Sequence, residues 1–466
     1  MQKSKLIQLL QTFERAEWRL FRKFLCSPYF NQREDVVRLF DYLRNCVVEF
    51  KMEPNKESAF KTVYRAETYN DHKLRVAMSN LFKLAEQFIL CEAHRSQEEQ
   101  HQLELAKNYR ARGLEKLFSQ ALKRAEEEQH KSEVRDTSFF QKEYAIQQEI
   151  YNYRATNKRI DELNFEEIFE ALDIHFLIQK LKQSCFALSH QQVYKTEYNY
   201  GLIIPLLSHI AENDLLQIKS IALYYHCYLA LSASEKTHHF QSLKQLLFEV
   251  DQQFQHTEMR DLYLLAINFC LRQYNAGNPS YLPDLLEFYQ EGLERKYLLT
   301  DQRISRFTYR NVVTLGLIQR EYSWIEQFIH AYKEYLEPKY QESMFGLCLA
   351  RLEYSKGNYD KALSLLQKAD YQDLLLNLAA KTVQIKIYFA LDELDLLEAH
   401  LHAMQAFIRR KKVMAYHRDN YLNMIRLVRK VLELQPFDKQ GKEALKREIQ
   451  EQKSLVEREW LLEILD

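Results

Sequence analysis

Residues 343–369, with the sequence SMFGLCLARLEYSKGNYDKALSLLQKA, decide the fold class predicted for this chain. Apolar residues recur every three or four positions on both sides of Gly357 and Asn358. This spacing is typical of amphipathic helices, and a glycine next to an asparagine interrupts a helix. The stretch therefore predicts a pair of helices joined by a short turn.

Similar breaks recur outward from this unit. They fall near residues 236, 277, 320, 357 and 392, at intervals of 35 to 43 residues. A period in this range, with two helices in each unit, indicates a helical solenoid. The chain also has only 8 glycines and 7 prolines among 466 residues, or about 3% against an ordinary ~12%. Sandwiches, barrels and sheets with many tight turns need more of both. We therefore predict an all-α protein.

The pattern along the chain predicts three parts. Helical stripes in residues 1–100 are interrupted at Ser27-Pro28 and Pro54-Asn55, and Asn31 followed by Glu34 predicts a capping box. From about residue 101 the helices become more charged, and from about 200 they form pairs. We predict an N-terminal helical bundle at 1–100, a helical-repeat array at 101–410, and capping helices with a basic face at 411–466.

The unit at 343–369 resembles a tetratricopeptide repeat (TPR) in six residues: Leu349, Ala350, Gly357, Tyr359, Ala362 and Ala369. It departs from the family pattern at Glu353, where an aromatic residue is usual, and at Leu374, where a proline is usual. The resemblance implies an α-solenoid of TPR-like helix pairs. It also implies that small residues lie where paired helices cross. The first helix of each pair would then line a concave groove for an extended peptide or a partner helix.

The same resemblance assigns residues to that groove. Its groove-facing positions are Arg351 and Tyr354 in the best unit, with Arg310 and Lys386 in the flanking units. Three cations in a partly desolvated groove are suited to carboxylates, because each one donates charge-assisted hydrogen bonds. The implied partner is another protein.

The opening block carries a second resemblance. Ser27-Pro28-Tyr29-Phe30-Asn31 follows a helix that contains tryptophan and phenylalanine, and this segment looks like uncharacterised proteins of Bacteroidota. That family has no assigned activity. The resemblance therefore implies no mechanism.

Glycine and cysteine positions exclude the commonest enzyme motifs. The closest glycines, Gly346 and Gly357, are eleven residues apart, whereas phosphate-binding loops and nucleophile elbows need glycines within six positions. There is no C-x-x-C pair, and Cys91 with His94 has no second pair to complete a zinc site. His226 and Cys227 are neighbours and face different sides of a helix. We predict no catalytic residues, no metal and no cofactor.

Charge and hydropathy restrict the location. Lys and Arg number 65, as do Asp and Glu, so the net charge is zero and a nucleic-acid coat or membrane-surface protein is disfavoured. The longest uncharged runs, 198–211 and 220–234, have 14 and 15 residues and are too short to span a bilayer. Seven scattered cysteines suit a reducing compartment. We expect a cytoplasmic protein with no membrane contact.

One local excess of positive charge stands out. Residues 405–447 contain twelve Lys or Arg and four Asp or Glu. At 100° per residue, six of these cations gather on one side of a helix: Lys411, Lys412, Arg418, Arg426, Arg429 and Lys430. The strip is either a solvated face of a capping helix or a docking site for an acidic partner or a nucleic-acid backbone.

Residues 56–83 have the outline of a helix-turn-helix, with Lys73, Arg75, Asn80 and Lys83 on the second helix. Residues 51–100 hold eight cations and eight anions, a balance that disfavours phosphate binding. The sequence therefore predicts a non-catalytic protein-binding scaffold or adaptor. The alternative is a regulator that contacts nucleic acid through the N-terminal head or the basic strip. The oligomeric state stays open.

Overall fold

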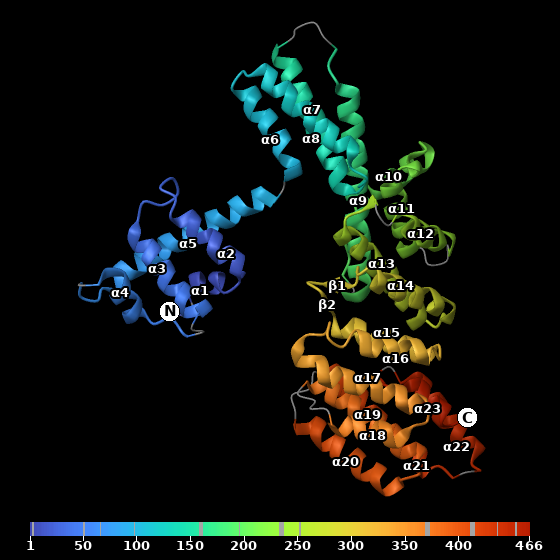
Figure 1. Ribbon diagram of the computed structural model, residues 1–466. Coiled ribbons are helices and arrows are strands. Elements are labelled where there is room, and N and C mark those ends of the chain that lie inside the picture. Colours follow the sequence, from blue (N-terminus) through green and yellow to red (C-terminus); the bar gives the residue numbers. More distant parts are fainter. Residues whose placement is uncertain are drawn as a thin grey trace. The chain divides into compact units, whose positions relative to one another are not determined.

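The computed structural model describes residues 1, 4–49, 52–65, 67–96, 98–157, 162–194, 196–232, 237–250, 253–368, 373–410, 415–435, 437–452 and 454–466 (Figure 1). Helix accounts for 79% of these described residues. Within the described ranges the strands are β1 (Leu299–Thr300) and β2 (Arg303–Ile304), of two residues each. The predicted all-α class is confirmed. None of the helices in these ranges has the length and apolar character needed to cross a bilayer.

Contacts divide the chain into two compact units. The first holds residues 1–133 and 141–172, and the second holds 134–140 and 173–466. The chain passes from one unit to the other at three points: just before α8 (Thr137–Asn157), within α8, and within α9 (Phe165–Tyr194). The domain boundaries predicted near residues 100 and 410 stay predictions.

An aromatic core holds the first helices of the first unit together. The ring centroid of Phe21 lies 5.2 Å from that of Phe40 and 5.0 Å from that of Phe88, and Trp18 stacks on Phe40 at 5.4 Å. These rings come from three helices, so their burial fixes how the helices pack. The helices of this block are α1 (Lys5–Leu10), α2 (Arg15–Leu25), α3 (Glu34–Arg44), α4 (Lys56–Tyr64) and α5 (Asp71–Ser96), with a short π-helix at Asn45–Glu49.

The predicted capping box at Asn31 is wrong. Arg33, not Asn31, is the N-cap residue of α3, and its side chain makes no cap hydrogen bond. The Asn31 side chain instead closes the loop before the helix. Its Nδ2 donates to the carbonyl oxygens of Leu25 and Arg33, both at 3.0 Å, and its oxygen accepts from the backbone N–H of Arg33. The residue is therefore engaged in turning the chain away from α2.

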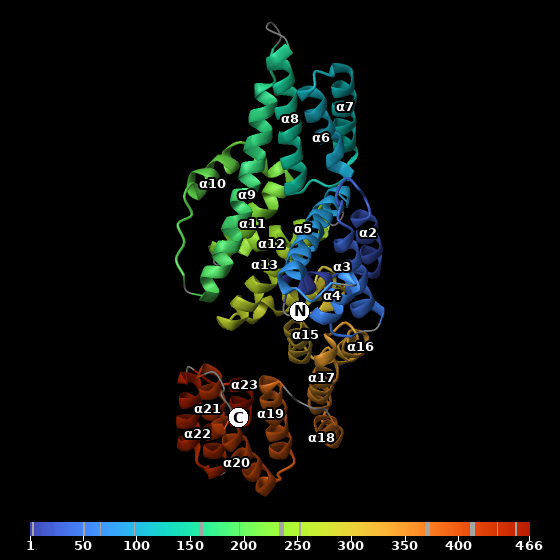
Figure 2. The same ribbon diagram turned by 90° about the vertical axis from the view of Figure 1, so that its left-hand side faces the viewer.

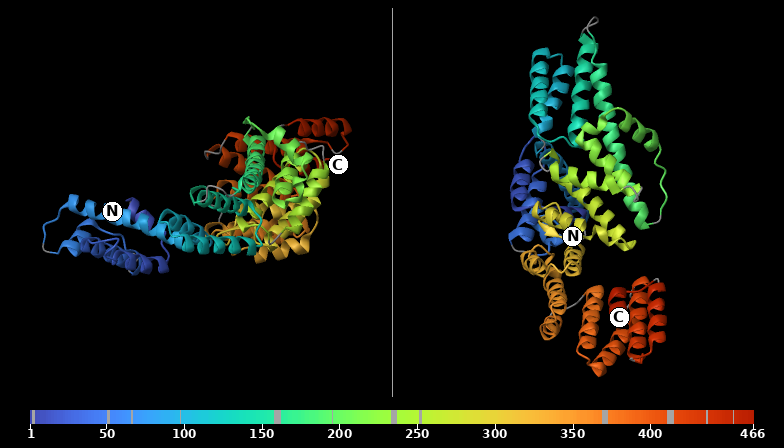
Figure 3. Two further views of the ribbon diagram at one scale, coloured as in Figure 1. Left: turned by 90° about the horizontal axis from the view of Figure 1, so that it is seen from above. Right: turned by 90° about the vertical axis from the view of Figure 1, so that its right-hand side faces the viewer.

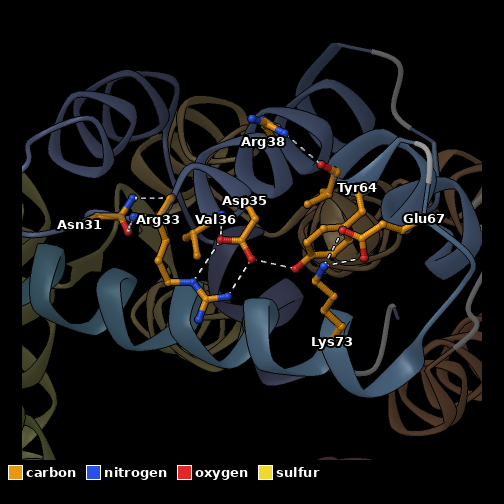
Figure 4. Close-up of polar contacts among 9 residues, drawn as sticks. Asn31, Arg33, Asp35, Val36, Arg38, Tyr64, Glu67 and Lys73 are labelled. Carbon is orange, nitrogen blue, oxygen red and sulfur yellow. Dashed lines mark hydrogen bonds and ion pairs between the residues drawn. The ribbon is translucent and has the colours of Figure 1, made fainter.

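A polar cluster ties α3, α4 and α5 together (Figure 4). The Asp35 carboxylate accepts hydrogen bonds from Arg33, at 3.0 and 2.7 Å, and from the Tyr64 hydroxyl at 2.8 Å. Lys73 Nζ donates to Glu67 at 2.7 Å and lies 4.2 Å from the centre of the Tyr64 ring. The hydrogen bond from Arg33 lowers the pKa of Asp35, while burial and then Asp35 raise the pKa of Tyr64.

The rest of the first unit is formed mainly by α6 (Glu98–Ala111), α7 (Glu115–Lys131) and most of α8. Gly113, at φ +69°, allows the sharp turn between α6 and α7. Arg110 of α6 forms an ion pair with Glu149 of α8, whose side chain is only 3% exposed. Because a buried carboxylate needs a partner, this pair fixes how the two helices face each other.

Successive helices of the second unit contact one another as pairs. The predicted break at 320 separates two helices, because α15 ends at Ile318 and α16 begins at Tyr322. The predicted breaks at 277, 357 and 392 separate helices in the same way. The predicted break at 234–236 lies outside the described residues. The helices are α10 (Ile203–Glu212), α11 (Lys219–Ser232), α12 (Thr237–Glu249), α13 (His256–Asn275), α14 (Leu282–Glu294), α15 (Arg306–Ile318), α16 (Tyr322–Ala331), α17 (Gln341–Ser355), α18 (Tyr359–Lys368), α19 (Leu374–Ala390) and α20 (Leu394–Arg410), with short 3-10 turns at Leu215–Gln217, Pro279–Tyr281 and Pro338–Tyr340.

Glu258 of α13 is a buried polar hub in this unit. Its carboxylate accepts from the Tyr224 hydroxyl at 2.7 Å and the Thr137 hydroxyl at 2.6 Å, and Lys182 lies 3.4 Å away. These partners come from α11, α8 and α9. The carboxylate therefore links the start of α8 to α9, α11 and α13. The ammonium group of Lys182 and the two hydroxyl groups offset the free-energy cost of burying its negative charge.

The chain ends in three more helices, α21 (Ala415–Glu433), α22 (Lys439–Glu451) and α23 (Arg458–Glu463). They share one apolar cluster with α19 and α20. In Figure 2 α21 lies between α20 and α22, and the right-hand view of Figure 3 shows the orange and red helices of this region lying side by side.

The close approach of α15 and α16 provides a test of how tightly the helices of the second unit are packed. Gly316 of α15 is buried against α16, and a Cβ at this position would overlap the side chain of Ile325. We expect Gly316→Ala to lower the free energy of unfolding by about 1–3 kcal/mol, because an overpacked core must distort. Chemical denaturation measures this loss. In an Ile325→Ala background the same substitution should lose much less, and an equal loss in both backgrounds would contradict the proposed overlap.

Candidate partner-binding face

The four residues assigned to a groove lie on three helices that contact one another in order. Arg310 is on α15, Arg351 and Tyr354 are on α17, and Lys386 is on α19. Arg351 Nη1 donates to Thr314 Oγ1 of α15 at 2.8 Å, one turn beyond Arg310. At their N-terminal ends α15 and α19 are joined by an ion pair of 2.7 Å between Arg306 and Asp373. We call these four residues the cation face.

Lys386 and Tyr354 meet across the α17–α19 contact. Lys386 Nζ lies 5.9 Å from the centre of the Tyr354 ring, within reach of a cation–π interaction. The Lys386 side chain is 15% exposed. Burial, together with neighbouring tyrosine and glutamate side chains, raises the pKa of Tyr354 to about 12, so its hydroxyl stays protonated at neutral pH. The two residues thus form one partly desolvated surface.

Two side chains that contact this surface were not predicted from the sequence. Glu457 forms an ion pair with Lys386, and the Trp460 ring centre lies 5.5 Å from the same ammonium group. Trp460 also meets Phe389 of α19 edge to face, with ring centroids 5.7 Å apart. Both residues belong to the stretch 454–466, which we call the docked segment. Its one sequence signal is an apolar run from Trp460 onward, after the highly charged α22.

The charges around Glu457 are matched. Burial alone would raise the pKa of its carboxyl group, but the charges of Lys386 and Arg351 outweigh that effect and lower the pKa. Glu457 has φ +58°, a left-handed conformation that a residue with a Cβ adopts at some cost in free energy. The ion pair therefore holds the backbone in a conformation that the local sequence does not favour.

Two further contacts anchor the docked segment. Asn423 Nδ2 of α21 donates to the carbonyl oxygen of Ser454 at 2.9 Å, and Lys446 of α22 forms an ion pair with Asp466 at 2.7 Å. Leu461 is fully buried in the apolar cluster of the last helices. The segment is thus held at both ends, and its central Glu457 and Trp460 lie against the cation face.

Arg310 differs from Lys386. Among the described residues it has no carboxylate within ion-pair distance, and it is half-buried. Its charge opposes the rise that burial causes in the pKa of Tyr421, a residue of α21. In the cation face, Glu457 therefore neutralises the charge of Lys386, whereas no described carboxylate neutralises the charge of Arg310.

The basic strip is engaged within the chain wherever it is described. Arg426 and Lys430 both contact Glu448 of α22, and Arg429 pairs with Glu398 of α20 at 3.0 Å. Arg418 lies 3.5 Å from its neighbour Asp419. Lys411 and Lys412 lie outside the described residues. Three of these four cations, Arg426, Arg429 and Lys430, therefore help to hold α20, α21 and α22 together, whereas the contact of Arg418 stays within α21. The sequence pattern did not distinguish this structural role from a docking role.

Two cations of the helix-turn-helix outline are also paired. Lys73 binds Glu67, and Arg75 forms an ion pair with Asp71, the first residue of its own helix. Asp71 also accepts from Lys56 at 2.8 Å. These contacts are local and hold α4 and α5 in place.

The described residues contain no group of three or more His, Cys, Asp or Glu side chains placed to bind a metal ion. The His226 ring faces His239, with their Nδ1 atoms 2.9 Å apart. The Cys185 thiol near Cys227 is buried, and burial raises its pKa well above the ordinary value, which disfavours a reactive thiolate. Comparisons with protein-family models, curated proteins and solved structures found no match.

The pH dependence of stability tests the role of Glu457. Because its pKa is lowered from 4.5, its contribution to stability is complete above pH 4.5 and is lost as the pH falls through the lowered value. Glu457→Gln should therefore lower the free energy of unfolding by about 1–3 kcal/mol at pH 7, between the values for exposed and buried pairs.

Thermal or urea unfolding of both proteins, from pH 7 to well below pH 4.5, measures this difference. We expect the deficit of the variant to shrink with acidification. A deficit that does not change with pH would mean that Glu457 acts through packing rather than charge.

Proposed function

We propose that this chain is a non-catalytic, cytoplasmic scaffold or adaptor that binds another protein. In this proposal its helix pairs form a TPR-like solenoid, and the first helices of three successive pairs present a groove at the cation face. The proposal depends on one observation: three cations and Tyr354 lie on three helices that contact one another, at Arg310, Arg351 and Lys386. One of these cations, Lys386, already binds the carboxylate of Glu457. The chemistry is therefore that of carboxylate recognition.

The charge arrangement supports this function over a purely structural role. Guanidinium and ammonium groups that are partly removed from water bind carboxylates more strongly than exposed ones. Arg310 has its charge uncompensated by any described carboxylate at ion-pair distance, and Tyr354 adds a rigid apolar surface. Arginine and tyrosine dominate the binding energy of protein interfaces for the same reasons.

Affinity capture from the native cell, with and without nuclease, tests the proposal. We expect a stoichiometric protein partner that survives nuclease treatment. Arg310→Glu should reduce its capture by at least about tenfold, because the variant presents a repelling charge to the partner's carboxylate. Circular dichroism and the melting temperature should show that the variant remains folded.

Lys368→Glu is the matched control. Lys368 is an exposed cation at the end of α18, the second helix of its pair, and the substitution changes the charge by the same amount. Its capture should equal that of the wild-type chain. Equal loss in both variants would indicate a general charge effect, and loss of every partner after nuclease would favour the nucleic-acid alternative, with binding that falls steeply with salt.

A further inference from the structure

The docked segment shows which chemistry fits the cation face. Its Glu457 carboxylate binds Lys386 and lies within the field of Arg351, while Trp460, three residues later, contacts Lys386 and Phe389. Glu457 is the N-cap residue of α23, and Trp460 lies in the first turn. A carboxylate and an indole on one side of a short helix therefore satisfy both the charge and the aromatic part of this surface.

We propose that the docked segment is an intramolecular ligand of the cation face, and that the partner binds there through a segment with the same pair: a carboxylate at the start of a helical turn and a large aromatic ring three residues later. This inference rests on the proposed function. It identifies the partner's chemistry and a competition that controls its access.

Two features of the docked segment favour its displacement from the cation face by a partner. Its helix has only six residues, too short to be stable alone, and Glu457 is in a left-handed conformation. A partner segment that reaches the same contacts without this backbone conformation would avoid its free-energy cost. An attached ligand has an effective concentration in the millimolar range, so a free segment of equal intrinsic affinity would bind the intact chain more weakly.

A labelled peptide measures the competition directly. The probe is residues 454–466, SLVEREWLLEILD, with carboxyfluorescein joined to its N-terminal amine by an amide bond and with an amidated C-terminus. Fluorescence anisotropy is recorded with three full-length chains: wild type, Glu457→Gln with Trp460→Ala, and that double variant with Lys386→Glu. The double variant leaves the cation face intact and removes the contacts of the docked segment with it.

We expect the double variant to bind the peptide at least about tenfold more tightly than the wild-type chain, because its own segment no longer competes. Adding Lys386→Glu should abolish binding. In the double variant this charge reversal should leave the protein folded, because the glutamine introduced at position 457 carries no charge that would repel a glutamate at position 386. A peptide with Gln in place of Glu457 should bind more weakly to the double variant than the original peptide does.

Trp460 is largely buried, so Trp460→Ala can disturb the last helices. Glu457→Gln alone then provides the second variant, because it keeps the packing and should still bind the peptide more tightly than wild type. Equal binding to wild type and both variants, no binding to either variant, or binding that ignores Lys386→Glu would each overturn the inference.

The peptide-binding experiment and the affinity capture can fail independently, so a failure of the inference can be told apart from a failure of the proposed function. A captured partner that is lost with Arg310→Glu, together with no peptide binding, would leave the adaptor function and overturn the intramolecular ligand. Peptide binding that depends on Lys386, with no captured partner, would support the contact and overturn the adaptor function.

Discussion

The fold of the second unit depends on the fact that its central helices are apolar on almost every side. α17 buries nine residues, which include Met344, Leu347, Leu349 and Leu352 and so face in all directions around the helix. A helix of this kind is stable only when neighbours cover it on each side. The apolar cluster accordingly continues from α9 to α19 without interruption, and each pair depends on the pairs before and after it. Small residues such as Gly316 make the close crossings within a pair possible.

This stacking has a consequence for polar side chains. Once α15, α17 and α19 are side by side, Arg351, Tyr354 and Lys386 are brought close together on surfaces that are partly removed from water. Positive charge in such a place is unfavourable unless a negative group compensates it. Glu457 does so for Lys386, although its backbone must adopt a left-handed conformation to reach it. The last residues are therefore both part of the packed core, through Leu461, and a ligand of the charged surface.

Charged residues elsewhere show the structural use of the same chemistry. Arg426, Arg429 and Lys430 join neighbouring helices through Glu448 and Glu398, and the Asp35 cluster joins the N-terminal helices. What distinguishes the cation face is that Arg310 has no described carboxylate at ion-pair distance and that aromatic rings adjoin the cations. These two features are the reason for proposing a binding role at the cation face rather than on the basic strip.

The sequence by itself determined the helical class and the positions of many helix ends, because these depend on residues close together in the chain: apolar spacing and breaks such as Gly357-Asn358 act locally. The resemblance to tetratricopeptide repeats suggested that Arg310, Arg351, Tyr354 and Lys386 belong to neighbouring units, and these residues lie on α15, α17 and α19. Only the tertiary structure decided that Asn31 closes a turn rather than capping α3, and that Glu457 and Trp460 meet Lys386. The Asn31 hydrogen bonds are local, but several residue types can cap a helix or close a turn, and packing selects between these roles. The contacts of Lys386 join residues about seventy positions apart, and no local pattern specifies which distant carboxylate a given cation will meet once the helices have packed.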